Sequence, residues 1–116
     1  MLKLTLLIYR NVFILSPMTD DLKAIPGIKV AAEAILANDL EGGPIRTTFA
    51  LLMKFCSLRR PDMSNEDHFN AFVRWLCLKG VAQFKHDIAI AMAGKLVFIF
   101  FVLHLRALNH LHDPLD

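Results

Sequence analysis

The sequence is poor in the residues and motifs on which small enzymes and metal-binding domains depend. Its 116 residues include only two cysteines, Cys56 and Cys77, and these do not form a CxxC pair. We therefore expect two reduced, buried thiols in an intracellular, reducing compartment. No nucleophile elbow, glycine-rich phosphate loop or HExxH pair occurs in the sequence. These absences predict a protein that is not an enzyme and that uses no cofactor.

The excess of charge is also small. The formal net charge is +2, which is too little to attract nucleic acid by charge alone. The middle third, residues 41–80, has six basic and four acidic side chains, and is therefore slightly basic. Nucleic acid is thus not the favoured partner. An alternative interpretation is a helical nucleic-acid-binding or viral structural protein that uses a basic patch of Arg59, Arg60, Arg74 and Lys79.

The first 15 residues lack the features of a secretory signal. Their apolar run is interrupted by Arg10 and Asn11, and Ser16-Pro17 follows it. The basic, acid-free start resembles a mitochondrial presequence, but it has few hydroxyl side chains. We expect a core helix here, with two short strands that turn at Arg10-Asn11 as the alternative. Intracellular localisation is favoured, and a membrane-peripheral or mitochondrial location stays open.

Apolar side chains are what the sequence has in excess. They make up 55% of the residues, and the mean hydropathy is +0.45. A chain of 116 residues is expected to form a single domain, 1–116. Such a small domain cannot bury so many apolar side chains, so some of them should face a partner or lipid.

Proline and glycine divide the chain into helical segments. We predict a short helix that starts at Ser16-Pro17 and ends before Pro26, and a second over residues 28–40. A third is expected to open at Pro44 and to end at residue 58, with Ile45, Phe49, Leu52 and Cys56 on one stripe. The last segment, residues 81–112, contains one interruption, Gly94, and is either one long helix or two. The sequence therefore predicts an all-α fold, a compact bundle of five or six helices around an apolar C-terminal helix.

The segment 64–78 has the clearest helical pattern. Ser64, followed three residues later by Asp67, resembles a capping box, and Gly80 should end the helix. Phe69, Phe72, Val73 and Leu76 are spaced to form one apolar stripe. We expect this stripe to face the core and to pack against residues 96–103.

The most apolar stretch is "AMAGKLVFIFFVLHL", residues 91–105. As a membrane span, residues 88–103 would be short. They would also place Lys95 at the centre, where inserting a lysine into the bilayer costs about 2.5–3.5 kcal/mol. We therefore favour a central core helix that is apolar on every side. The third interpretation is a protein interface, for which Phe98, Phe101, Leu105 and Leu108 are the candidate residues.

Histidines gather near the end of the chain at His104, His110 and His112. A helical zinc pair needs a spacing of four, whereas these are six and two apart, so no metal site is predicted. The other acid–base groups, His86-Asp87 and Glu66-Asp67-His68, are adjacent in sequence. Adjacent residues on a helix do not face each other, so neither group forms a catalytic dyad by itself.

One stretch, "GPIRTTFALLMKF" at residues 43–55, resembles the start of the second helix in mosquito-borne flavivirus capsid proteins, and Arg74-Trp75 has a counterpart there at another spacing. That family consists of small all-α dimers that bind RNA and lipid. Its members are strongly basic at both ends, whereas this chain ends in "HDPLD". The resemblance spans barely a dozen residues, and no residue roles follow from it.

The sequence as a whole predicts a non-enzymatic interaction or assembly subunit. It would expose apolar helix surface to copies of itself, as a homo-oligomer, or to other proteins. The first alternative is a small membrane-associated protein that inserts residues 88–103.

Overall fold

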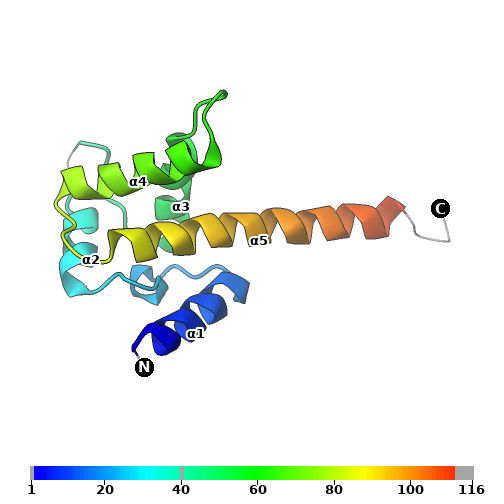
Figure 1. Cartoon of the computed structure of the whole chain (residues 1–116), viewed down its shortest axis with the longest axis horizontal. Helices are drawn as coiled ribbons and strands as arrows, with labels where there is room; N and C mark the ends of the chain where they lie inside the picture. Colours follow the sequence, from blue (N-terminus) through cyan, green and yellow to red (C-terminus); the bar gives the residue numbers. More distant parts are fainter. Residues whose placement is uncertain (1, 40, 112–116) are drawn as a thin grey trace.

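The computed structural model describes residues 2–39 and 41–111, with side chains from residue 7 to 39 and from 41 to 109. This part of the chain forms five α-helices and one 3-10 turn, which confirms the predicted all-α bundle around an apolar C-terminal helix. In chain order they are α1 (Leu2–Leu15), η1 (Leu22–Ala24), α2 (Val30–Ala37), α3 (Thr48–Ser57), α4 (Asn65–Lys79) and α5 (Lys85–Leu111). Figure 1 shows α5 running through the molecule, with α4 along one side of its first half and α1 along the other.

The core lies along the first half of α5. Ile88, Ala89, Ala91 and Met92 are completely buried there, against α1, α3 and α4. Gly94 does not break α5, whose total length is 27 residues. From Leu96 to Asn109 none of the side chains is buried, and Figure 1 shows the second half of α5 projecting past the other helices. The prediction that residues 96–103 form the centre of the core was therefore wrong, because the other described helices lie along the first half of α5.

Helix α4 begins and ends where its capping residues predict. The Ser64 hydroxyl accepts a hydrogen bond from the Asp67 amide at 3.0 Å, and Gly80 ends the helix with φ +99°. Both Phe72 and Leu76 are completely buried, which confirms that the apolar stripe faces the core. Helix α4 contacts α5, the helix that contains the predicted partner segment 96–103, and the Phe72 ring also packs edge-on against Phe55 of α3, at 5.1 Å between centroids.

Two other predicted helices are shorter than expected. Between Pro17 and Pro26 only the turn η1 forms, where the Asp21 carboxylate accepts a hydrogen bond from the Lys23 amide. Pro44 does not open α3, since Thr47 is the capping residue and its hydroxyl accepts from the Ala50 amide at 3.0 Å. The helix starts three residues after Ile45, so the predicted stripe is not continuous.

The burial within α3 also differs from the predicted stripe. Leu51, Leu52 and Phe55 are buried, whereas Phe49 is 55% exposed. Helix α2 is likewise shorter than the predicted 28–40, beginning at Val30 and ending at Ala37.

Residues Leu2–Leu15 form a helix, so the alternative of two strands was wrong. Helix α1 is nevertheless not a core helix, because among residues 7–15 only Phe13 is buried. Its outer face is apolar and exposed, with Ile8, Val12 and Leu15. Helix α1 therefore lies on the surface of the bundle and is held there mainly by its last turn.

Both cysteines are free thiols, but only one of them is covered by other side chains. Cys56 is half-buried, and this burial raises the pKa of its thiol. Cys77 is exposed on α4, so the prediction of two buried thiols was wrong for this residue.

Candidate interaction surface

An extended exposed apolar surface lies on the projecting half of α5. The side chains of Val97 and Phe100 are 68% and 61% exposed, and no charged residue occurs between Lys95 and Arg106. A soluble monomer rarely leaves aromatic side chains together in water, because burying each of them is strongly favourable. This part of α5 is therefore the candidate site for a binding partner.

Most of the exposed large apolar side chains in this segment lie along one side of the helix, and Leu103 lies on the other. At 100° per residue, Val97, Phe101, His104 and Leu108 are separated by steps of four, three and four and lie within about 60° of one another. The residues Phe100 and Leu105 flank this row. We call Val97, Phe100, Phe101, Leu105 and Leu108 the apolar stripe. The spacing is that of helices which pack lengthwise against another helix.

A groove adjoins the start of the apolar stripe. Its volume is about 530 Å³, and it is bounded by α3, the first turns of α4 and the middle of α5. Its apolar lining includes Phe69, Leu96, Val97 and Phe100, and Arg59 and Glu66 lie at its polar edge. Since Val97 and Phe100 belong to both the groove and the stripe, the two form one continuous apolar surface.

The opposite side of α5 contacts the end of α1. Lys95 is only 1% exposed, and its ammonium group donates hydrogen bonds to the carbonyl oxygens of Phe13 at 2.9 Å, Ile14 at 3.3 Å and Ser16. These carbonyls lie at the C-terminal end of α1, where the helix dipole favours a positive charge. Burial lowers the pKa of the Lys95 amine. Lys95 therefore joins α1 to α5 within the bundle.

Gly94 makes the close approach of α1 possible. A Cβ atom at this position would lie 2.5 Å from Cδ1 and 3.1 Å from Cγ1 of Ile14. Both distances are shorter than the van der Waals contact distance between two non-bonded carbon atoms. Gly94 and Lys95 thus form a socket for the last turn of α1. Sequence reasoning treated them as a helix interruption and an unfavourable charge, and no local pattern indicates the three carbonyl partners.

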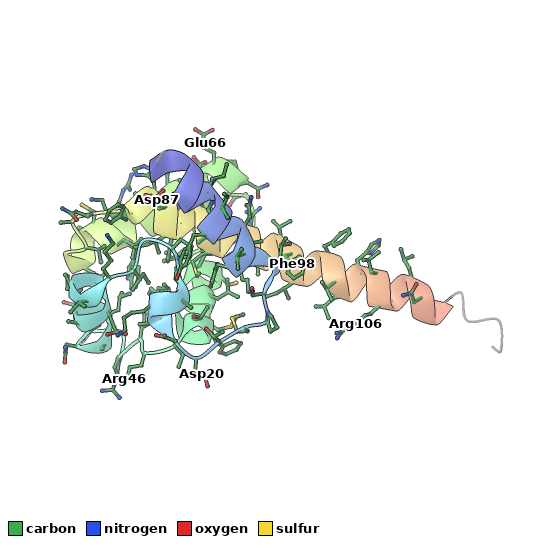
Figure 2. The ribbon with its side chains drawn as sticks, turned by 90° about the horizontal axis from the view of Figure 1, so that it is seen from below. Asp20, Arg46, Glu66, Asp87, Phe98 and Arg106 are labelled. Carbon is green, nitrogen blue, oxygen red and sulfur yellow. The ribbon has the colours of Figure 1, made fainter. Side chains whose placement is uncertain are left out.

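The four residues predicted as an interaction surface do not share one environment. Phe101, Leu105 and Leu108 are exposed on the apolar stripe, as an interface requires. Phe98 is half-buried and lines a small hollow with Ser16 and Met18, on the side of α5 that faces the end of α1. Figure 2 shows Phe98 where α1 reaches α5, and Arg106 further out on the projecting half. Sequence reasoning missed Val97 and Phe100, whose exposure depends on where α4 begins.

The four residues of the predicted basic patch do not form one continuous basic surface. The Lys79 ammonium group is paired with Asp39 at 3.0 Å and Glu41 at 3.3 Å. The Arg59 guanidinium donates hydrogen bonds to the Asn65 side chain and the Met63 carbonyl. Arg60 and Arg74 line one shallow hollow together with two carboxylates, Asp62 and Asp67. Among the described residues, Lys79 therefore belongs to an ion-paired cluster, whereas Arg60 and Arg74 line a separate hollow.

The histidines also occupy separate places. His104 is exposed on α5, while His110 and His112 lie outside the side chains that the structure describes. His68 is buried, stacks on Phe55 and is hydrogen-bonded through Nε2 to the Phe55 carbonyl at 2.7 Å. This contact joins the start of α4 to the end of α3. Among the described residues, no group of three or more His, Cys, Asp or Glu side chains is placed to hold a metal ion.

Comparison with known proteins provides no functional information. No family model, no curated protein and no solved structure matches this chain. The function is therefore inferred from the geometry of the described residues.

Proposed function

We propose that this protein is a non-enzymatic assembly subunit that binds a second copy of itself through the apolar stripe on α5. The observation that supports the proposal is the exposure of the stripe on the half of α5 that projects past the other described helices. Phe72, Leu76 and Met92 are completely buried, whereas Val97, Phe100 and Phe101 face solvent. Association with another helix would bury the stripe as the core buries the first half of α5.

Two properties of the stripe favour a second copy as its partner: its lack of charged side chains and the area that a pair would bury. Residues 96–105 contain no Lys, Arg, Asp or Glu, so two copies can approach without repulsion between like charges. From ordinary side-chain sizes, the stripe offers on the order of 500 Å² per copy. A symmetric pair would bury about 1000 Å², which is near the lower limit for a specific interface. We therefore expect a dimer that dissociates on dilution.

The test compares two substitutions of the same kind on opposite sides of α5. Phe101 on the stripe and Leu103 on the other side are 55% and 52% exposed, so F101E and L103E add the same charge to similarly exposed positions. In size-exclusion chromatography with light scattering, F101E should weaken dimerisation at least about tenfold, since a central interface aromatic contributes about 2 kcal/mol or more. L103E should have little effect. A wild type that stays monomeric at high concentration would refute the proposal.

A membrane is the second candidate partner. The described residues contain one stretch, Lys85–Asn109, that is long and apolar enough to span a bilayer by length and composition, and 28% of its most apolar window is buried. The projecting part whose side chains are described, residues 97–109, is only about 20 Å long at 1.5 Å per residue, whereas the hydrocarbon core is about 30 Å thick. A spanning helix of about 20 residues would therefore have to withdraw Met92 and Lys95 from the bundle. This is why the protein partner is favoured.

Vesicle flotation without detergent distinguishes the two candidates. Insertion would bring all sides of the projecting half into lipid, so F101E and L103E should reduce flotation equally. Lys95→Leu should then increase retention by the membrane, because it removes the one charge near the centre of the span. If the protein stays with the soluble fraction, the membrane candidate is rejected.

A further inference from the structure

Resting on the proposed self-association, we propose that the two α5 helices pair antiparallel and that each copy inserts the end of its helix into the groove of the other. The side chains inserted would be Leu105 and Leu108 of the second copy. The groove would thus be the receptor half of the interface, and the end of α5 would be its ligand.

The position of α4 determines the direction of the second helix. The first residues of α4, Asn65 and Glu66, line the groove beside Val97 and Phe100, so α4 begins next to the start of the apolar stripe. Figure 1 shows the same arrangement, with α4 along the first half of α5 and none of the other described helices along the second half. A second helix that packs on the stripe at the usual interaxial distance of about 8–10 Å would meet α4 if it continued past Val97.

A parallel pair would require that continuation. The second α5 would extend from its own Val97 back toward Ile88 and into its own bundle, and this bundle would occupy the space of the first copy's α4. In an antiparallel pair the helix of the second copy instead approaches α4 with its C-terminal end. The structure describes α5 as far as Leu111, three residues beyond Leu108. The described part of α5 is therefore long enough to place Leu108 of one copy opposite Val97 of the other.

The register follows from the symmetry of the stripe. A two-fold axis midway between Val97 and Leu108 places Val97 of each copy opposite Leu108 of the other. It also places Phe100 opposite Leu105. Two leucines of the second copy then lie over Val97 and Phe100, which line the groove together with Phe69 and Leu96. The volume of about 530 Å³ is more than sufficient for two leucine side chains and is open to solvent in the single copy.

Cysteine cross-linking tests the direction of pairing. The natural thiols are first removed as C56A and C77S, and circular dichroism confirms that this background keeps its helices. Val97→Cys and Leu108→Cys are then introduced separately, with tags of different size, and the proteins are mixed and oxidised gently. The antiparallel pair should give mainly a disulfide between the V97C and L108C chains, because a disulfide forms only between closely spaced Cα atoms. Either variant oxidised alone should give little cross-linked product.

The outcomes separate this inference from the proposed function. A predominant V97C–V97C disulfide would mean a parallel pair and would overturn the inference, although self-association through the stripe would stand. A dimer by light scattering that yields neither disulfide would also overturn it, because α5 would not be at the interface in this register. Phe69→Glu, which places a charge in the groove, should reduce dimerisation at least tenfold if the groove receives the second helix. A dimer unaffected by F69E, in a variant that keeps its helices, would contradict the role of the groove.

Discussion

The contact between Gly94 and Ile14 allows a sharp test of how α1 is held on the bundle. Gly94 lies within α5, where replacing glycine by alanine ordinarily stabilises a helix by about 1 kcal/mol. Here the added methyl group would lie 2.5 Å from Cδ1 of Ile14. Overpacking of this kind typically costs about 1–3 kcal/mol. The Ile14 backbone is held in place because Lys95 donates hydrogen bonds to the carbonyl oxygens of Phe13 and Ile14, so the Ile14 side chain itself has to shift. We therefore expect Gly94→Ala to lower the free energy of unfolding by about 1 kcal/mol.

A double-mutant cycle with Ile14→Ala isolates the contact. In the I14A background the colliding atoms are gone, so G94A should show only its helix preference and raise the free energy of unfolding by about 1 kcal/mol. The coupling between the two positions would then be about 2 kcal/mol. Urea unfolding of the four proteins, followed by circular dichroism and by the fluorescence of Trp75, measures it. If G94A stabilises the protein equally in both backgrounds, α1 does not dock on Gly94 and the socket is wrong.

Three further predictions concern the core and the charged contacts. Phe72→Ala should lower the free energy of unfolding by about 3–5 kcal/mol, whereas substitution of the exposed Phe49 by alanine should change it by less than about 1 kcal/mol. If urea unfolding gives similar values for the two variants, the assigned core is wrong. Burial lowers the pKa of Lys95 below its ordinary 10.5, so as the pH rises the folded protein releases this proton before the unfolded protein does. The free energy of unfolding of the wild type should therefore rise with pH up to about 10.5, and it should rise less in K95M. The hydrogen bond from Lys79 lowers the pKa of Asp39 below its ordinary 3.8. The ionised Asp39 side chain therefore stabilises the folded protein above pH 3.8, and this stabilisation is lost as the pH falls through the lowered pKa. Acid unfolding should show a smaller loss in D39N than in the wild type, and identical curves would mean that the ion pair does not contribute.

The helix boundaries that the sequence determined are those fixed by local chemistry. Ser64 and Gly80 specify the two ends of α4, because a hydroxyl that caps backbone amides and a glycine with positive φ act within a few residues. The spacing of Phe72 and Leu76 likewise fixes which side of α4 is buried, since it depends only on the helical period. Where two local signals competed, as at Pro44 and Thr47, the choice of the first helical residue was not predictable from the sequence.

The candidate site depended on contacts between distant segments. The sequence of α5 is apolar both before and after Lys95, so its composition does not indicate which half is covered. That difference arises because α3 and α4 flank only the first half and leave Val97 and Phe100 exposed. Lys95 itself appears in the sequence as an isolated charge, and its burial is favourable only because α1 brings three carbonyl oxygens to it from about 80 residues away. Local propensity therefore determined the helices, whereas the packing of α1 and α4 against α5 decided which of its side chains are left for a partner.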